Sequence, residues 1–127
     1  MSSSADIKRT LEKYPAVMLY FSAPSCGVCH ALAPKLLNAL EVNFPRFKTL
    51  LIDISSHPEL TSHFGVYTVP TVLVYFEGKE FIRKSRNMSV PGLVEEIRRP
   101  YELLIPNALE HSAGDDVTQV PLDQNAH

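Results

Sequence analysis

The chain has 127 residues, of which 45% are hydrophobic and 20% are charged, and its formal net charge is −2 at pH 7. This length suits one domain with a core of moderate size. The nearly balanced charge argues against nucleic-acid binding, and no apolar stretch approaches the ~20 residues that span a bilayer. The chain starts at Met1 and lacks the apolar segment of a secretory signal, so we expect a cytoplasmic protein.

The spacing of apolar residues divides the chain into eight expected elements. Runs rich in Val, Leu, Tyr and Phe predict strands, and apolar residues three or four apart predict helices. The expected elements are a helix over 5–13, a strand over 16–22, a helix over 26–43, a strand over 47–54, a helix over 58–64, strands over 72–76 and 80–85, and a helix from 90 that Pro100 should end or kink. The first strand–helix–strand unit predicts a parallel, right-handed crossover.

Three details of this pattern concern packing. Pro34 lies inside the second helix, where its missing N–H and its ring predict a kink. Phe81 is expected to face the core from the returning strand of the last hairpin. No apolar period is sustained after residue 105, so we expect a domain over 1–105 and a solvated, flexible tail over 106–127.

The only two cysteines, Cys26 and Cys29, lie where the first strand meets the second helix. At a helix N-terminus, unpaired backbone N–H groups and the helix dipole favour the thiolate of Cys26. A thiolate attacks disulfides, and Cys29, one turn further on, is close enough to attack the mixed disulfide that results. The pattern therefore predicts a redox pair in which Cys26 is exposed and Cys29 faces the sheet.

Other interpretations of the cysteine pair stay open. Zinc needs four ligands, usually as two separated pairs, and the histidines that could add to the cysteines are His30, His57 and His63. An iron–sulfur cluster shared between two subunits and a pair of inert core cysteines are further alternatives. We favour the redox interpretation, with no bound metal or cofactor. His57 and His63 are expected on the surface, as is His30, for which tuning of the thiolate is the alternative.

A basic cluster lies in the second half of the chain, and a solvated face is its default interpretation, with docking of an acidic partner as the alternative. Its members are Arg83, Lys84, Arg86, Arg98 and Arg99.

Several motifs resemble the thioredoxin family. The segment from Phe21 to Cys29 looks like the family's active-site segment, with Gly27 and Val28 between the cysteines in place of the usual Gly-Pro. The further matches are Pro34 with the proline that kinks the active-site helix, Val69-Pro70-Thr71 with the cis-proline loop, and Gly78 with the glycine of the last hairpin. The resemblance covers about residues 7–104.

The resemblance implies an α/β thioredoxin fold with a central mixed sheet flanked by helices. The N-terminal region is too short for the family's first strand, so we expect four strands in the order 47–54, 16–22, 72–76, 80–85. The resemblance also implies that the bond between Val69 and Pro70 is cis and lies beside the cysteines. There it would present backbone groups to an extended substrate chain.

The resemblance implies a thiol–disulfide oxidoreductase that reduces protein disulfides, with Cys26 as the nucleophile and Cys29 as the resolving residue. Its implied partners are disulfide-containing proteins and a thioredoxin reductase. Three positions depart from the family pattern: Tyr20 replaces a buried Asp, Ser25 replaces a Trp, and Thr49 replaces a Lys.

These departures keep two alternatives open, a thioredoxin-fold module for binding or redox sensing with weak or no reductase activity, and a glutathione-linked, glutaredoxin-like enzyme. We expect Tyr20 to be a packing residue whose phenol stays protonated near pH 7 and can at most donate a hydrogen bond.

Overall fold

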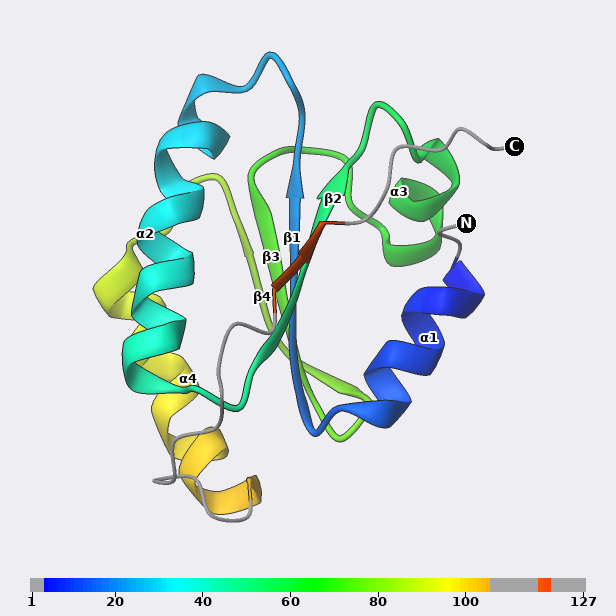
Figure 1. Ribbon diagram of the computed structural model, residues 1–127. Coiled ribbons are helices and arrows are strands. Elements are labelled where there is room, and N and C mark those ends of the chain that lie inside the picture. The colour runs from blue at the N-terminus through cyan, green and yellow to red at the C-terminus, as the bar shows by residue number, and fades with distance from the viewer. Residues whose placement is uncertain (1–3, 106–116, 120–127) are drawn as a thin grey trace.

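The computed structural model describes residues 4–105 and 117–119 as helices and strands around one sheet (Figure 1). The elements are α1 (Ser4–Lys13), β1 (Ala16–Ser22), α2 (Gly27–Asn43), β2 (Lys48–Asp53), α3 (Pro58–Phe64), β3 (Thr71–Phe76), β4 (Lys79–Ser85), α4 (Val90–Leu104) and β5 (Val117–Gln119). The eight predicted elements are present, with bounds that mostly move by one or two residues. No helix in the described ranges is long and apolar enough to cross a membrane.

The sheet has the strand order β4-β3-β1-β2-β5. Strands β1 and β2 are parallel, whereas β3 runs antiparallel to both of its neighbours, β1 and β4. The order predicted for the first four strands is confirmed.

The structure adds a fifth strand to the four that were expected. Residues 117–119 pair in parallel with β2, with Leu50 opposite Thr118. The expectation of a tail outside the fold therefore fails for these three residues, and the rest of the predicted tail lies outside the described residues. A local apolar pattern does not reveal this strand because backbone hydrogen bonds to the free edge of β2 position it.

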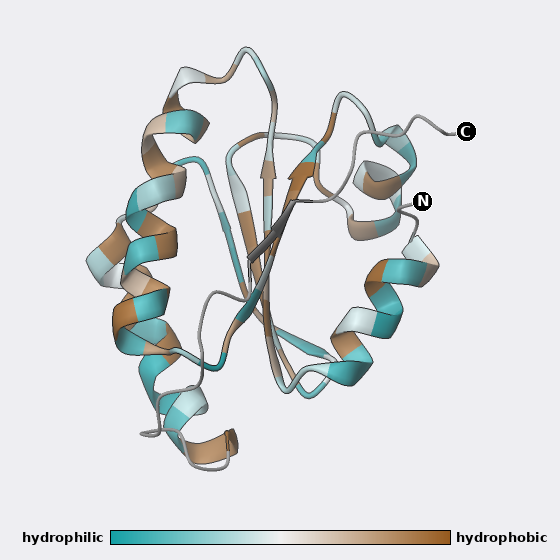
Figure 2. Cartoon of the chain, viewed as in Figure 1, coloured by the Kyte–Doolittle hydropathy of each residue, from teal (hydrophilic) through white to brown (hydrophobic). Residues whose placement is uncertain are grey.

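Helices cover both faces of the sheet: α2 and α4 lie on one face, and α1 and α3 lie on the other (Figure 1). Side chains along β1 point alternately to the two faces of the sheet, and each face has its own apolar cluster. Met18 and Tyr20 belong to the apolar cluster under α2 and α4, whereas Leu19 and Phe21 belong to the cluster under α1 and α3. In Figure 2 the helices alternate between hydrophobic and hydrophilic residues along their length, as expected for elements that bury one face.

Helix α4 continues through Pro100 to Leu104. Aromatic packing holds its last turns against the core. Tyr101 is 1% exposed, its ring stacks on Phe47 at a centroid distance of 5.8 Å, and its hydroxyl accepts a hydrogen bond from the backbone N–H of Arg46 at 3.0 Å. These contacts compensate for the helical hydrogen bond that Pro100 cannot donate.

Two packing predictions are wrong. Phe81 is 48% exposed, because the register passes from Val74 opposite Ile82 to Tyr75 opposite Glu80 and leaves Phe81 at a β-bulge.

His57 is 1% exposed instead of lying on the surface. It is the N-cap residue of α3, and its Nδ1 lies 3.8 Å from the carboxylate of Glu59. His63 is exposed on α3, as predicted.

Candidate active site

The two cysteines lie at the junction of β1 and α2, as the sequence predicts. Cys26 is the N-cap residue of α2, and its Sγ accepts a hydrogen bond from the backbone N–H of Cys29 at 3.1 Å. The residues are joined by a disulfide with their Cα atoms 5.3 Å apart. When the disulfide is reduced, the same N–H group and the positive end of the helix dipole stabilise a thiolate on Cys26.

The two sulfur atoms differ in access to solvent. Cys26 is partly exposed, whereas Cys29 is 1% exposed and belongs to the apolar cluster under α2. The reason is helical geometry: the capping residue stands at the end of the helix, whereas a residue one turn further along faces the sheet. A substrate disulfide can therefore reach Cys26 before it reaches Cys29.

Tyr20 binds the turn that holds Cys29. The phenol donates a hydrogen bond to the carbonyl oxygen of Cys29 at 2.7 Å, and the side chain is 2% exposed. Burial raises the pKa of Tyr20 to about 12. The phenol is therefore protonated at neutral pH and stabilises the position of Cys29 without serving as its base.

The sheet face under the cysteines has no ionised side chain at the two positions where the family pattern has an Asp and a Lys. Tyr20 occupies one of them. Thr49, at the other, is 2% exposed and lies opposite Met18 on the neighbouring strand. Two neutral side chains therefore replace a buried ion pair, and the site has no carboxylate there to accept a proton.

The loop before β3 lies at the same end of the sheet as the cysteines. Its Val69–Pro70 peptide bond is cis. Phe21, at the end of β1, pairs with Thr71, which places Pro70 level with the segment that leads to Cys26.

Partly buried and backbone hydrogen bonds fix this loop. The Thr71 hydroxyl donates to the Thr68 carbonyl at 2.7 Å and accepts from the Ser85 hydroxyl at 3.1 Å. The backbone N–H of Arg86 donates to the Pro70 carbonyl at 2.8 Å. The roles of Thr71 and Arg86 are missing from the sequence prediction, since both depend on the pairing of β3 with β4.

The other predicted site residues surround Cys26 or support the helix. Gly27 is exposed with open space around it, and Val28 is 63% exposed. His30 is exposed, and its Nε2 donates to the Pro24 carbonyl at 2.9 Å, which ties α2 to the loop before Cys26. Pro34 lies inside α2, where it leaves the carbonyl of His30 without its usual helical donor.

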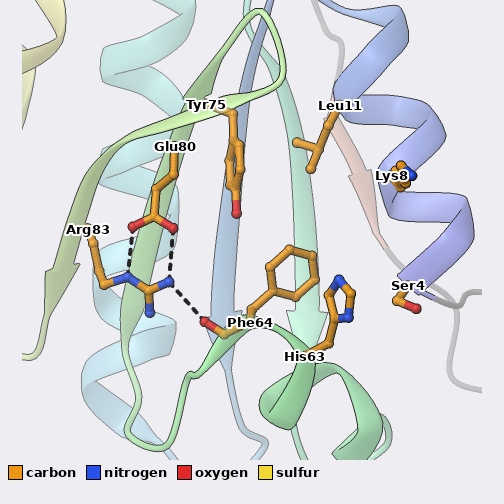
Figure 3. Close-up of a pocket in the computed structure, with 8 residues that line it drawn as sticks. All are labelled: Ser4, Lys8, Leu11, His63, Phe64, Tyr75, Glu80 and Arg83. Carbon is orange, nitrogen blue, oxygen red and sulfur yellow. Dashed lines mark hydrogen bonds and ion pairs between the residues drawn. The ribbon is translucent and has the colours of Figure 1, made fainter.

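A separate pocket of about 280 Å³ lies between α1, α3 and the β3–β4 hairpin (Figure 3). Its lining includes Lys8, Phe64, Tyr75 and Arg83, and none of the predicted site residues takes part. Residues 4–105 and 117–119 contain no group of three or more His, Cys, Asp or Glu side chains arranged to hold a metal ion.

A partly exposed and a buried cysteine one helical turn apart, at the carboxyl end of a central strand, are the geometry of a thiol–disulfide oxidoreductase. The comparisons agree with this class. The thioredoxin family model matches residues 2–99, and the chain belongs to the thioredoxin family.

Relatives and solved structures agree with this assignment. The thioredoxin-like protein YdfQ of Bacillus subtilis is 32% identical over 103 residues, which cover 81% of this chain and 91% of the relative. The thioredoxin of Chlamydia muridarum is 37% identical over 83 residues, or 65% of this chain and 80% of the relative. The structure of thioredoxin 1 from Thermosipho africanus superposes with a TM-score of 0.63 at 29% identity and covers 68% of this chain and 96% of that one.

Proposed function

We propose that this protein reduces disulfides in other proteins, with Cys26 as the nucleophile and Cys29 as the resolving residue. The observation that carries the proposal is the position of Cys26, partly exposed at the N-cap of α2 with its sulfur accepting the N–H of Cys29. This position supplies the stabilised thiolate and the access that the first attack needs.

The reaction transfers two electrons in two exchange steps. The Cys26 thiolate attacks one sulfur of the substrate disulfide, forms a mixed disulfide and releases the other substrate sulfur as a thiolate, which takes up a proton. The Cys29 thiol then loses its proton and attacks the Cys26 sulfur. The second substrate thiolate leaves, and the Cys26–Cys29 disulfide of the structure remains. A dithiol reductant, such as a thioredoxin reductase, must return the pair to its reduced form.

The surroundings of Cys26 suit an extended protein segment. The side chain of Val28, two residues after Cys26, is 63% exposed. Val69, next to the cis-proline, is partly buried and packs against the same apolar cluster as Cys26. Accessible apolar side chains such as these two valines, close to a reactive sulfur, favour a polypeptide substrate.

The position of Tyr20 favours a second candidate function, a binding or redox-sensing module. Its phenol is protonated and bound to a carbonyl, so it gives Cys29 no base for the resolving step. A chain that attacks but resolves slowly would hold its partners in mixed disulfides rather than reduce them.

Reduction of insulin disulfides by dithiothreitol, with and without the chain, separates the two functions. The native chain should accelerate reduction, Cys26→Ser should bring the rate down to that of dithiothreitol alone, and Cys29→Ser should accumulate the mixed disulfide. A native chain no faster than the Cys26→Ser variant would contradict the reductase proposal and favour the binding module. Activity that depends on glutathione instead of dithiothreitol would indicate a glutaredoxin-like enzyme.

A further inference from the structure

The basic cluster defined above contains paired and unpaired cations. Arg83 Nε lies 2.8 Å from the carboxylate of Glu80 (Figure 3), and Lys84 Nζ lies 2.8 Å from that of Glu96. Arg98 Nε lies 3.7 Å from the carboxylate of Glu95. Within the described residues the guanidinium groups of the other two members, Arg86 and Arg99, have no ion pair. The cluster is thus largely neutralised, and the two unpaired arginines can be considered separately.

Arg86 lies at the same end of the sheet as the cysteines, next to the end of β4. Its backbone N–H donates to the carbonyl of Pro70 at 2.8 Å. The register places Phe21, Thr71 and Ser85 side by side on β1, β3 and β4. Arg86 follows Ser85, so it lies two strand spacings, about 10 Å, from the segment that leads to Cys26. An extended peptide covers that span in about three residues.

The backbone of Arg86 has a conformation that favours glycine. Its φ is +58°, in the left-handed region where a side chain costs energy relative to glycine. Strained backbone of this kind persists where the surrounding structure holds it and is concentrated at functional sites. An arginine therefore occupies a position near the active site where glycine would adopt the backbone conformation at lower cost.

We propose that Arg86 selects substrates with an Asp or Glu within three residues of the attacked cysteine. The inference rests on the proposed reductase function and specifies its substrate class. A peptide bound to Cys26 and lying along the Pro70 loop brings such a carboxylate to the unpaired guanidinium, which can bind it through two N–H groups. Lysine at the same place in the peptide is repelled.

Symmetrical peptide disulfides of the form acetyl-Xaa-Gly-Gly-Cys-Gly-Gly-Xaa-amide, with Xaa as Asp, Asn or Lys three residues from the attacked cysteine, test the proposal. The measured quantity is the second-order rate constant for oxidation of the reduced chain, followed by acid quench and chromatography. At about 20 mM salt the native chain should react about threefold faster with the Asp peptide than with the Asn peptide, the effect of one exposed ion pair. The Lys peptide should be slowest, and 0.5 M salt should remove the differences.

Three variants assign the preference to one residue. Arg86→Gly should bring the Asp-to-Asn ratio to about one, and its glycine suits the backbone, so the fold should be retained. Arg86→Glu should invert the ratio. Arg99→Glu makes the same change in net charge at the other unpaired arginine, on α4, and should keep the native ratio.

A native ratio of one, or a ratio that Arg86→Gly leaves unchanged, would overturn the assignment of Arg86. Loss of the preference in Arg99→Glu would also overturn it, because net charge and not position would then be the cause. A native chain no faster than Cys26→Ser with the Asn peptide is a different result, since it contradicts the reductase function itself.

Discussion

Substitution of Tyr20 separates the structural and chemical roles of the group beneath the cysteines. The phenol donates to the Cys29 carbonyl at 2.7 Å, and burial raises its pKa to about 12. The resolving step needs a group that takes the proton from Cys29, and a protonated phenol bound to a carbonyl is not such a group. Tyr20→Phe should therefore affect stability only, whereas Tyr20→Asp should change the chemistry.

The expected magnitudes follow from the contacts. Tyr20→Phe removes one neutral hydrogen bond, worth about 0.5–1.5 kcal/mol, and should lower Tm by roughly 2–8 °C for a domain of this size. Tyr20→Asp supplies a carboxylate, which as a general base should accelerate resolution by about 100-fold. It also removes a buried ring, at a cost of about 3–5 kcal/mol, so its fold must be checked by circular dichroism before its kinetics are interpreted.

The assay follows both steps with a fluorescent peptide disulfide under rapid mixing. The first phase reports attack by Cys26 and the second reports release of the peptide by Cys29. Tyr75→Phe is the matched control, because Tyr75 is a buried tyrosine in the cluster on the opposite face of the sheet. It should leave both phases unchanged.

Two results would refute this reasoning. If release in the native chain is already as fast as attack, another group accepts the proton of Cys29. If Tyr20→Phe slows release more than tenfold while Tyr75→Phe does not, the hydroxyl takes part in the resolving step.

Three further predictions test the access to the cysteines, the fifth strand and the buried tyrosines. In the reduced chain iodoacetamide should modify Cys26 before Cys29, since Cys29 is 1% exposed; mass mapping that finds Cys29 modified first would contradict the assignment. Deletion of residues 106–127 should expose the edge of β2 and lower the free energy of unfolding by about 1–2 kcal/mol. Deletion of 120–127 alone should not do so, and equal Tm values for both deletions would show that β5 contributes nothing. Burial raises the pKa of all three buried tyrosines (Tyr20, Tyr75 and Tyr101). The tyrosines of the unfolded chain then ionise first, so their contribution to stability should be constant below about pH 10 and should be lost as the pH rises toward the folded pKa values. Urea unfolding at pH 8, 10 and 11 measures this fall, which should be smaller in Tyr101→Phe.

The sequence alone determined the features that depend on local chemistry. The six consecutive apolar residues from Ala16 to Phe21 are too few for a typical helix and are rich in strand-forming types, which favours a strand covered on both faces, and the structure buries all of them. Gly65 ends α3 and Gly78 lies in the turn between β3 and β4, at φ values of +67° and +81°, which glycine adopts without strain. The cysteine spacing placed one sulfur at the end of a helix and the other one turn inside it, which is enough to predict their difference in exposure.

Only the tertiary structure decided which distant groups meet. The burial of His57, the hydrogen bond from Tyr20 to the Cys29 carbonyl and the pairing of residues 117–119 with β2 all depend on neighbours that no local period specifies. Likewise, the five residues of the basic cluster look alike in the sequence. Arg86 differs from the other four because strand pairing places its backbone beside Pro70. The physical reason is that an apolar pattern states which side of an element is buried, whereas the element that covers it is chosen by packing across the whole chain.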